Sequence, residues 1–189
     1  MTPCAFAREV PGGRPPGTRS RHHWLRRPHW ASVVLGNDRS PNETFIQVEG
    51  TGLRIAADDL RQAMRQSASL SRVLLNFVNA FLIQTSHTAL SNGTATIEER
   101  LARWLLMAQD RLDGDEVPLT HEFLSLMLGV RRVGVTGALN QLGRKGLIRL
   151  SRGRIWIVDR DGLINSANGS YGIPEAMARQ SPRAQWERL

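Results

Sequence analysis

The chain has 189 residues, 25 basic and 17 acidic side chains, a formal net charge of +8 and an apolar fraction of 41%. This length allows one domain or two small ones with a real core. No apolar run is long enough to cross a bilayer, so we expect neither a membrane-spanning helix nor a membrane partner. Because Cys4 is the sole cysteine, an intrachain disulfide, an iron–sulfur cluster and a thiolate zinc site are excluded, and a cytoplasmic location is expected.

Positive charge is concentrated in two segments of the chain. Residues 131–160 carry eight basic side chains against one acidic, and residues 1–30 carry six against one. Residues 1–32 are rich in Gly, Pro and Arg and have no periodic apolar pattern, which predicts a disordered basic leader. Its histidines, His22, His23 and His29, have no defined ligand geometry, so we expect no metal site there.

Strand-like alternation begins near Glu43, with Thr44-Phe-Ile-Gln-Val-Glu and then Leu53-Arg-Ile. A short helix should follow, capped by Asp58 or Asp59 and ending near Gln66. We interpret residues 33–66 as the end of a small β-structure.

Residues 67–92 predict one long helix that Ser67 or Ser69 starts and Asn92-Gly93 breaks. Four apolar residues have the 4-3-4 spacing of a coiled-coil seam: Leu70, Leu74, Phe77 and Phe81. A second apolar strip beside it contains Val73, Val78 and Leu82. We expect one of these faces to pack on a twin chain and the other on its own chain. The alternative is a helix buried wholly within its own domain.

A third helix should begin at Thr96, because Thr96-Ile-Glu-Glu99 has the form of a capping box. Its core-facing stripe would contain Ile97, Leu101, Trp104, Leu105, Ala108 and Leu112. Thr120 then caps a short helix with Phe123, Leu124, Met127 and Leu128 at helical spacing, and Gly129 turns the chain. The next helix, from about Arg131 to Lys145, buries Val135, Ala138, Leu139 and Leu142 and ends at Gly146.

The other side of this helix carries hydrogen-bonding groups at intervals of four residues, from Arg132 through Thr136 and Asn140 to Arg144, with Arg131 at its entry. After Gly146, Ile148 and Leu150 alternate with polar residues, a turn follows at Arg152-Gly153, and Ile155 and Ile157 continue the alternation. This order predicts a winged helix-turn-helix with double-stranded DNA as its partner. The alternative interpretation is a solvated basic face on an ordinary small domain.

Four ordered motifs carry a family resemblance: Thr96-Ile-Glu-Glu-Arg-Leu-Ala-Arg-Trp-Leu-Leu, Pro118-Leu-Thr-His-Glu-Phe-Leu, Met127-Leu-Gly-Val-Arg-Arg and Gly146-Leu-Ile. With them, the chain resembles the Crp/Fnr family of bacterial transcription regulators. The resemblance implies a mainly α fold with a small β part (α+β). Its expected parts are a remnant of the sensor β-roll with the cyclic nucleotide-binding-like fold (33–66), a dimerisation helix (67–92), a winged DNA-binding domain (93–165) and a polar tail (166–189). A homodimer and RNA polymerase are the implied protein partners.

The resemblance also implies site residues. In the family an arginine for base edges stands at the start of the recognition helix, and Arg132 occupies that place. Some members of the family have an acidic residue and a second basic residue beside this arginine. Val133 and Gly137 occupy those positions here, so the operator sequence of those members cannot be assumed for this chain. Val133 is a candidate for contact with a thymine methyl, and Gly137 for a closer approach of the helix. The predicted DNA-binding set is Thr120, Arg131, Arg132, Val133, Thr136, Gly137, Asn140, Arg144, Arg152 and Arg154.

Catalysis is not predicted. The candidate acids and bases lie at expected caps or solvent faces: His87, His121, Asp58, Asp59, Glu98 and Glu99. We expect no catalytic residue, metal or cofactor, and no cyclic-nucleotide binding, because most of the sensor roll has no counterpart here. A truncated or misread start is our hypothesis for that difference. The alternative function is a sensor-deleted interaction module that heterodimerises with full-length relatives and modulates them.

Overall fold

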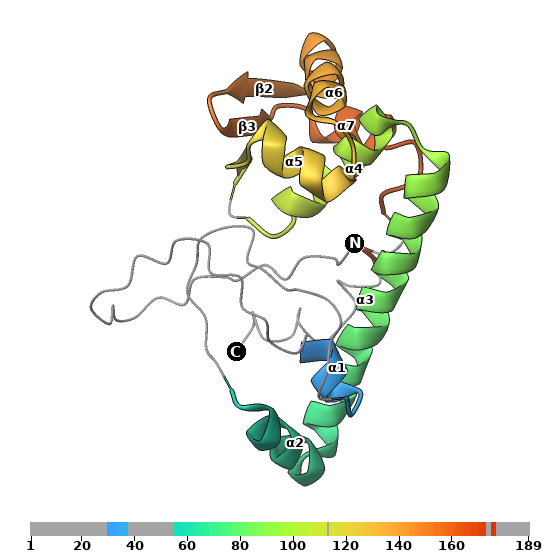
Figure 1. Cartoon of the computed structure of the whole chain (residues 1–189), viewed down its shortest axis with the longest axis vertical. Coiled ribbons are helices and arrows are strands. Elements are labelled where there is room, and N and C mark those ends of the chain that lie inside the picture. Colours follow the sequence, from blue (N-terminus) through green and yellow to red (C-terminus); the bar gives the residue numbers. More distant parts are fainter. Residues whose placement is uncertain (1–29, 38–54, 113, 173–174, 177–189) are drawn as a thin grey trace, which may run out of the picture. The chain divides into compact units, whose positions relative to one another are not determined.

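The structure, a computed structural model, describes residues 30–37, 55–112, 114–172 and 175–176. Figure 1 labels its helices and the strands β2 and β3. The chain divides into two compact units, and the division between Leu82 and Ile83 falls inside one long helix. The fold class is the predicted one, because the described residues are mostly helical with one small sheet.

Helices are the regular secondary structure in the described part of the first unit. It contains α1 (Trp30–Val34), α2 (Ala57–Gln66) and the first part of α3 (Ala68–Thr94). A small apolar cluster joins these helices and consists of Ala31, Val34 and Val78, with Leu60, Met64 and Leu74 packed against it. The strands predicted at Thr44–Glu49 and Leu53–Ile55 lie outside the described residues, except for Ile55, which is in neither a helix nor a strand. The interpretation of 33–66 as a sensor remnant therefore stays a prediction.

The helix boundaries correct two sequence predictions. Helix α2 begins at Ala57 with Ala56 as its N-cap and no side-chain cap, so Asp58 and Asp59 lie in its first turn and do not cap it. The predicted start of α3 is confirmed, because the Leu70 N–H donates to Ser67 Oγ at 3.2 Å. Its predicted end is wrong, since α3 runs through Asn92-Gly93 to Thr94. One glycine next to asparagine was not enough to end a helix that is already long.

The second unit is built around α4 (Ile97–Gln109), which begins with the predicted capping box. Thr96 Oγ1 accepts the Glu99 N–H at 3.3 Å, and the Glu99 carboxylate accepts the Thr96 N–H at 2.7 Å. After α4 come β1 (Glu116–Val117), α5 (His121–Leu128), α6 (Arg132–Arg144), β2 (Ile148–Ser151), β3 (Arg154–Ile157) and α7 (Arg160–Ser166). Helix α4 packs against α6 and α7.

The three strands form an antiparallel sheet in the order β1-β3-β2. In the β2–β3 hairpin, Leu150 pairs with Ile155 and Ile148 with Ile157, and Val117 of β1 pairs with Ile155 from the other side. The buried core collects apolar side chains from every layer: Leu101, Leu105, Leu106, Val117, Leu124, Val135, Leu139, Leu142, Ile155 and Leu163. Apolar residues from the predicted faces of α4, α5 and α6 are therefore buried together with residues of the sheet.

The first residues of the predicted tail contact the second unit. Tyr171 Oη donates to Asp110 Oδ2 at 2.7 Å, and Arg160 Nη2 donates to Tyr171 Oη at 2.7 Å. Arg160 also forms an ion pair with Asp110 at 2.7 Å. These bonds attach the segment that follows α7 to the end of α4.

A buried arginine holds this segment further along. Arg103 of α4 is 3% exposed and donates from Nε to the Ser170 carbonyl at 2.8 Å and from Nη1 to Thr88 Oγ1 at 3.0 Å. Its Nη2 lies 3.6 Å from Oε1 of Glu175, which is 5% exposed. Burial lowers the pKa of Arg103, and the charge of Glu175 opposes that shift. Glu175 therefore belongs to the packed unit, which polar composition alone did not indicate.

Candidate nucleic-acid interface

The two helices of the predicted helix-turn-helix are joined by a tight turn. Thr120 Oγ1 accepts the Phe123 N–H at 3.2 Å and caps α5, as predicted. Gly129 ends α5 in the left-handed region, with φ at +63°, which glycine adopts without steric cost. Arg131 is the N-cap residue of α6, and Gly146, with φ at +74°, follows its last turn. Glycine therefore stands on both sides of α6, at the turn that follows α5 and at the turn that precedes β2.

Helix α6 has one buried side and one exposed side. The buried side is the predicted one, made of Val135, Ala138, Leu139 and Leu142. Six of the predicted DNA-binding residues are exposed at its entry or on its outer side: Arg131, Arg132, Val133, Gly137, Asn140 and Arg144. Within the described residues, the side chains of Arg131, Arg132 and Arg144 form no hydrogen bond or ion pair. The described residues therefore do not neutralise these three cations.

Thr136 differs from its neighbours in the predicted row. It is half-buried, and its Oγ1 lies 3.0 Å from His121 Nδ1 at the start of α5. This hydrogen bond joins the two helices of the motif. Thr136 therefore has a structural partner, and only part of its surface is open to a ligand.

The β2–β3 hairpin, which is the wing of the predicted motif, carries three arginines in three different settings. Arg152 stands in the β2–β3 turn and is exposed, without a hydrogen bond or ion pair to any described residue. Arg154 is exposed too, but its Nη1 forms an ion pair with Glu116 Oε1 of β1 at 2.7 Å. Arg149 places its guanidinium 5.1 Å from the ring centre of Trp156. Arg149 was not among the predicted residues, although alternation along β2 places it on the outer face of the hairpin.

The comparison with known protein families decides what this arrangement is. The model of the Crp-like helix-turn-helix domain matches residues 99–166, a range that contains α4 from its third residue onward, the helix-turn-helix and the β2–β3 hairpin. This part of the chain is a Crp-like helix-turn-helix domain.

One solved structure with a TM-score above 0.5 shares the fold, and two others show a weaker similarity. FixK2 from Bradyrhizobium japonicum is similar with a TM-score of 0.54 at 24% identity, over 59% of this chain and 58% of that one. A Crp/Fnr-family protein from Eubacterium rectale has a TM-score of 0.47 at 24% identity, over 61% of this chain and 53% of that one. A CRP-family regulator from Thermus thermophilus has a TM-score of 0.43 at 23% identity, over 63% of this chain and 60% of that one. The chain thus spans little more than half of the length of these structures. No curated protein matches it in sequence.

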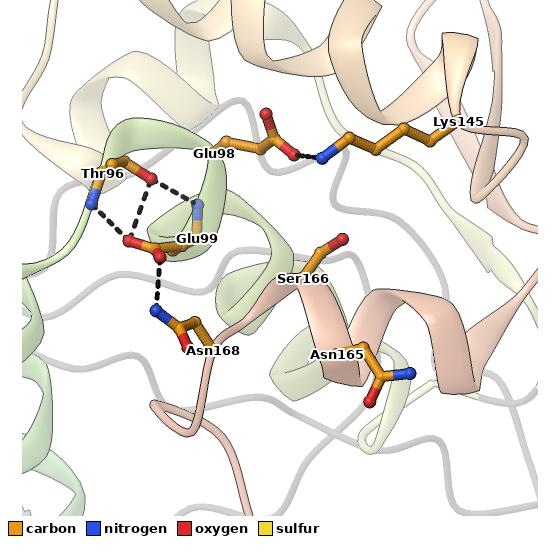
Figure 2. Close-up of a pocket in the computed structure, with 7 residues that line it drawn as sticks. All are labelled: Thr96, Glu98, Glu99, Lys145, Asn165, Ser166 and Asn168. Carbon is orange, nitrogen blue, oxygen red and sulfur yellow. Dashed lines mark hydrogen bonds and ion pairs between the residues drawn. The ribbon is translucent and has the colours of Figure 1, made fainter.

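The second unit has a surface pocket where the start of α4 meets the ends of α6 and α7 (Figure 2). It is lined by Thr96, Glu98, Glu99, Lys145, Asn165, Ser166 and Asn168. Lys145 forms an ion pair with Glu98, and Asn168 Nδ2 donates to Glu99 Oε1 at 2.7 Å. The hydrogen bond from the Thr96 backbone, followed by that from Asn168, lowers the pKa of Glu99. These charged groups are occupied in joining three helices, so the pocket has a structural explanation.

The candidate acids and bases of the Crp-like domain are dispersed. Glu98 and Glu99 are at the N-terminus of α4, whereas His121 forms a hydrogen bond with Thr136. Within the described residues, no group of three or more His, Cys, Asp or Glu side chains could hold a metal ion. No helix of the described part has the length and apolar character that a bilayer crossing requires.

The predicted dimerisation row lies on α3, outside the matched domain. Leu74 packs against the apolar cluster of its own unit, so this position faces its own chain. Leu70 and Phe81 are half-buried, and Phe77 is 38% exposed. Two other apolar residues, Leu75 and Leu82, are more exposed, at 47% and 53%.

Proposed function

We propose that this chain is a sequence-specific DNA-binding transcription regulator that inserts α6 into the major groove of duplex DNA. The observation that carries the proposal is the outer side of α6, where hydrogen-bonding and basic side chains stand exposed on a helix whose other side is fixed in the core. A helix of this kind fits the major groove, where each base pair presents a distinct set of donors and acceptors. Membership of residues 99–166 in the Crp-like domain family supports it.

The roles of the polar residues follow from their chemistry. Arg132, in the first turn of α6, is our candidate for bidentate contact with a guanine edge, and Asn140 for contact with an adenine edge. Arg144, at the far end, and Thr120, at the start of α5, are candidates for phosphate or groove-edge contacts. Arg131 would neutralise phosphate beside the entry of the helix.

The wing would bind the backbone. Arg152 is the stronger candidate for a phosphate contact, because its charge is unpaired within the described residues. Arg154 would first have to leave Glu116, so we expect it to contribute less. Each phosphate contact releases counterions from the DNA, so binding weakens as the salt concentration rises. A plot of the logarithm of the binding constant against the logarithm of the salt concentration should have a slope of about −0.9 per contact.

A homodimer would present two copies of α6 to adjacent major grooves, as two half-sites require. The proposal of dimerisation through α3 rests on its apolar residues, both the predicted row Leu70, Leu74, Phe77 and Phe81 and the more exposed pair Leu75 and Leu82. Leu75 and Leu82 are seven residues apart and share one side of the helix. Sedimentation of the wild-type chain and of a Leu75→Ser/Leu82→Ser variant tests this. A wild-type monomer at micromolar concentration would overturn it.

The DNA proposal is tested by selecting bound fragments from a random duplex library at 50 mM salt. The affinity for the selected duplex and for a scrambled duplex is then measured between 50 and 200 mM salt. Arg132→Ala and Arg152→Ala are compared with Arg65→Ala, which removes an exposed arginine from α2. We expect Arg65→Ala to bind as the wild type. Failure of the wild type to retard any duplex at low ionic strength would refute the proposal.

If the chain binds no DNA alone but forms a heterodimer with a full-length relative, the interaction module is the correct function. Action on RNA polymerase and a place in the cytoplasm follow from the regulator proposal and stay predictions. Transcription from a promoter that carries the selected duplex, in a purified system with and without the chain, would measure the first of them.

A further inference from the structure

An apolar side chain is exposed where α6 would meet the bases. Val133, the second residue of α6, is 76% exposed, the largest fraction among the exposed large apolar residues of the described chain. A β-branched residue has a lower helix propensity than most alternatives at a solvated position. Val133 therefore contributes little to the core or to the helix, and its side chain is available to a ligand.

Helix geometry places Val133 at the centre of the outer side. With 3.6 residues per turn, Asn140 and Arg144 lie within about 20° of Val133 around the helix axis, and Gly137 within about 40°. The buried Val135 and Leu142 point about 160° to 180° away from it. Arg132 stands about 100° to one side. If α6 enters a groove with its outer side forward, Val133 faces the base edges near its N-terminal end.

Gly137 leaves an opening one turn after Val133. A Cβ built at Gly137 has no atom within 4 Å, apart from its chain neighbours and the backbone of its own helix. Packing within the described residues therefore gives no reason for glycine here, and glycine weakens a helix interior relative to alanine. By contrast, a Cβ at the half-buried Gly134 would lie 3.1 Å from Ile97 Cδ1. A side chain at Gly134 would therefore crowd Ile97, whereas one at Gly137 would meet open space.

We propose that Val133 and the opening at Gly137 form a notch that reads the C5-methyl group of a pyrimidine in the major groove. This inference rests on the proposed DNA-binding function and assigns one determinant of its specificity. The C5-methyl is the apolar group that base edges present in this groove, and thymine carries it where cytosine carries a hydrogen. The isopropyl group of Val133 would pack against the methyl, while the missing side chain at Gly137 lets the base edge approach. A 5-methylcytosine offers the same methyl group.

The test uses the duplex selected by the wild-type chain and changes single chemical groups in it. Each thymine of one half-site is replaced in turn by uracil, which removes only the methyl group. We expect one position to weaken wild-type binding roughly fourfold, the effect of burying about one methyl group. In the Val133→Ala variant, replacing the same thymine with uracil should leave the affinity nearly unchanged. Val158→Ala, which shortens another exposed valine of the same domain, should keep the wild-type penalty.

A second arm separates the two sources of the methyl group. The sensitive T·A pair is replaced by C·G, with either cytosine or 5-methylcytosine. The wild-type chain should bind the 5-methylcytosine duplex more tightly than the cytosine duplex. The Val133→Ala variant should bind these two duplexes equally. Tight binding without methyl dependence at any thymine would overturn the inference and leave the proposed function standing. A penalty that persists in Val133→Ala would also overturn it. Absence of binding to every duplex would refute the proposed function itself.

Discussion

The arginines of the second unit have opposite environments on its two sides. On the side of α4 and α7, each is held by the protein: Arg100 donates to the Leu128 carbonyl, Arg103 to Thr88 and Ser170, and Arg160 to Asp110 and Tyr171. On the side of α6 and the wing turn, four are exposed and have no hydrogen bond or ion pair to a described residue: Arg131, Arg132, Arg144 and Arg152.

The difference separates two uses of one residue type in a chain that has a single lysine, Lys145. A guanidinium withdrawn from water must be compensated by hydrogen bonds or an opposite charge, so Arg103 and its partners are part of the fold. An exposed guanidinium gives the fold little, so its energetic effect should appear when a phosphate or base arrives. Substitutions on the first side should therefore change stability, and those on the second should change binding.

The largest expected effect is that of Arg103→Ala. The change removes the hydrogen bonds to Thr88 and Ser170 and leaves the Glu175 carboxylate buried beside an empty space. Breaking a buried pair in this way costs about 3–5 kcal/mol of unfolding free energy. Urea unfolding followed by circular dichroism measures it. Arg132→Ala is the matched control and should unfold within about 0.5 kcal/mol of the wild type; an equal loss in both variants would contradict the comparison.

The next largest effect should be seen in DNA binding and not in stability. Arg132→Ala should cost about 1–3 kcal/mol of binding free energy at one base pair of the selected duplex, whereas Arg152→Ala should weaken binding to all sequences alike and reduce the salt slope by about 1. Titrations of selected and scrambled duplexes at several salt concentrations distinguish the two. The assignment of Arg132 to a base edge fails if both variants lose the same affinity on both duplexes.

Most of the second unit could be predicted from the sequence because its signals are local. The capping box at Thr96, the cap at Thr120 and the left-handed Gly129 and Gly146 each fix a helix end through bonds to nearby residues. Apolar periodicity then identified the buried side of α6. The exposed set on α6 followed from the same periodicity, whereas its function in DNA binding stays a prediction.

The features that the sequence did not indicate depend on distant residues. Strand β1 has only two residues, and Val117 becomes a strand residue because Ile155 pairs with it. Helix α7, capped by Asp159, was not predicted either. Glu175 looked like a tail residue, since nothing near it in sequence indicates Arg103 as its partner. Likewise, the packing of Leu74 on its own unit required the positions of α1 and α2.

A smaller effect is expected at Gly137, on the exposed side of α6, where a substitution can change both the free energy of unfolding and the affinity for DNA. Gly137→Ala adds a methyl group in open space and replaces a helix-interior glycine, so unfolding should cost about 0.5–1 kcal/mol more than in the wild type. The same methyl group should hinder the approach of α6 to the bases, and affinity for the selected duplex should fall. Thermal unfolding and duplex titration measure the two. A variant that is more stable and binds DNA equally well would show that the opening is not used.

The smallest effect concerns pH and belongs to the structural side. The backbone N–H of Thr96 and then the amide of Asn168 hold the pKa of Glu99 below its ordinary value of 4.5, since both donate to the ionised carboxylate. The stabilisation by the Glu99 charge is therefore fully present above pH 4.5 and is lost as the pH falls through the lower pKa of the folded state. Glu99→Gln keeps a capping group but not the charge. Wild type and variant should thus differ in urea midpoint at pH 7 and converge towards pH 3, with Glu122→Gln on α5 as the charge-matched control. A difference that stays constant over this range would mean that the ionised carboxylate is not what stabilises the start of α4.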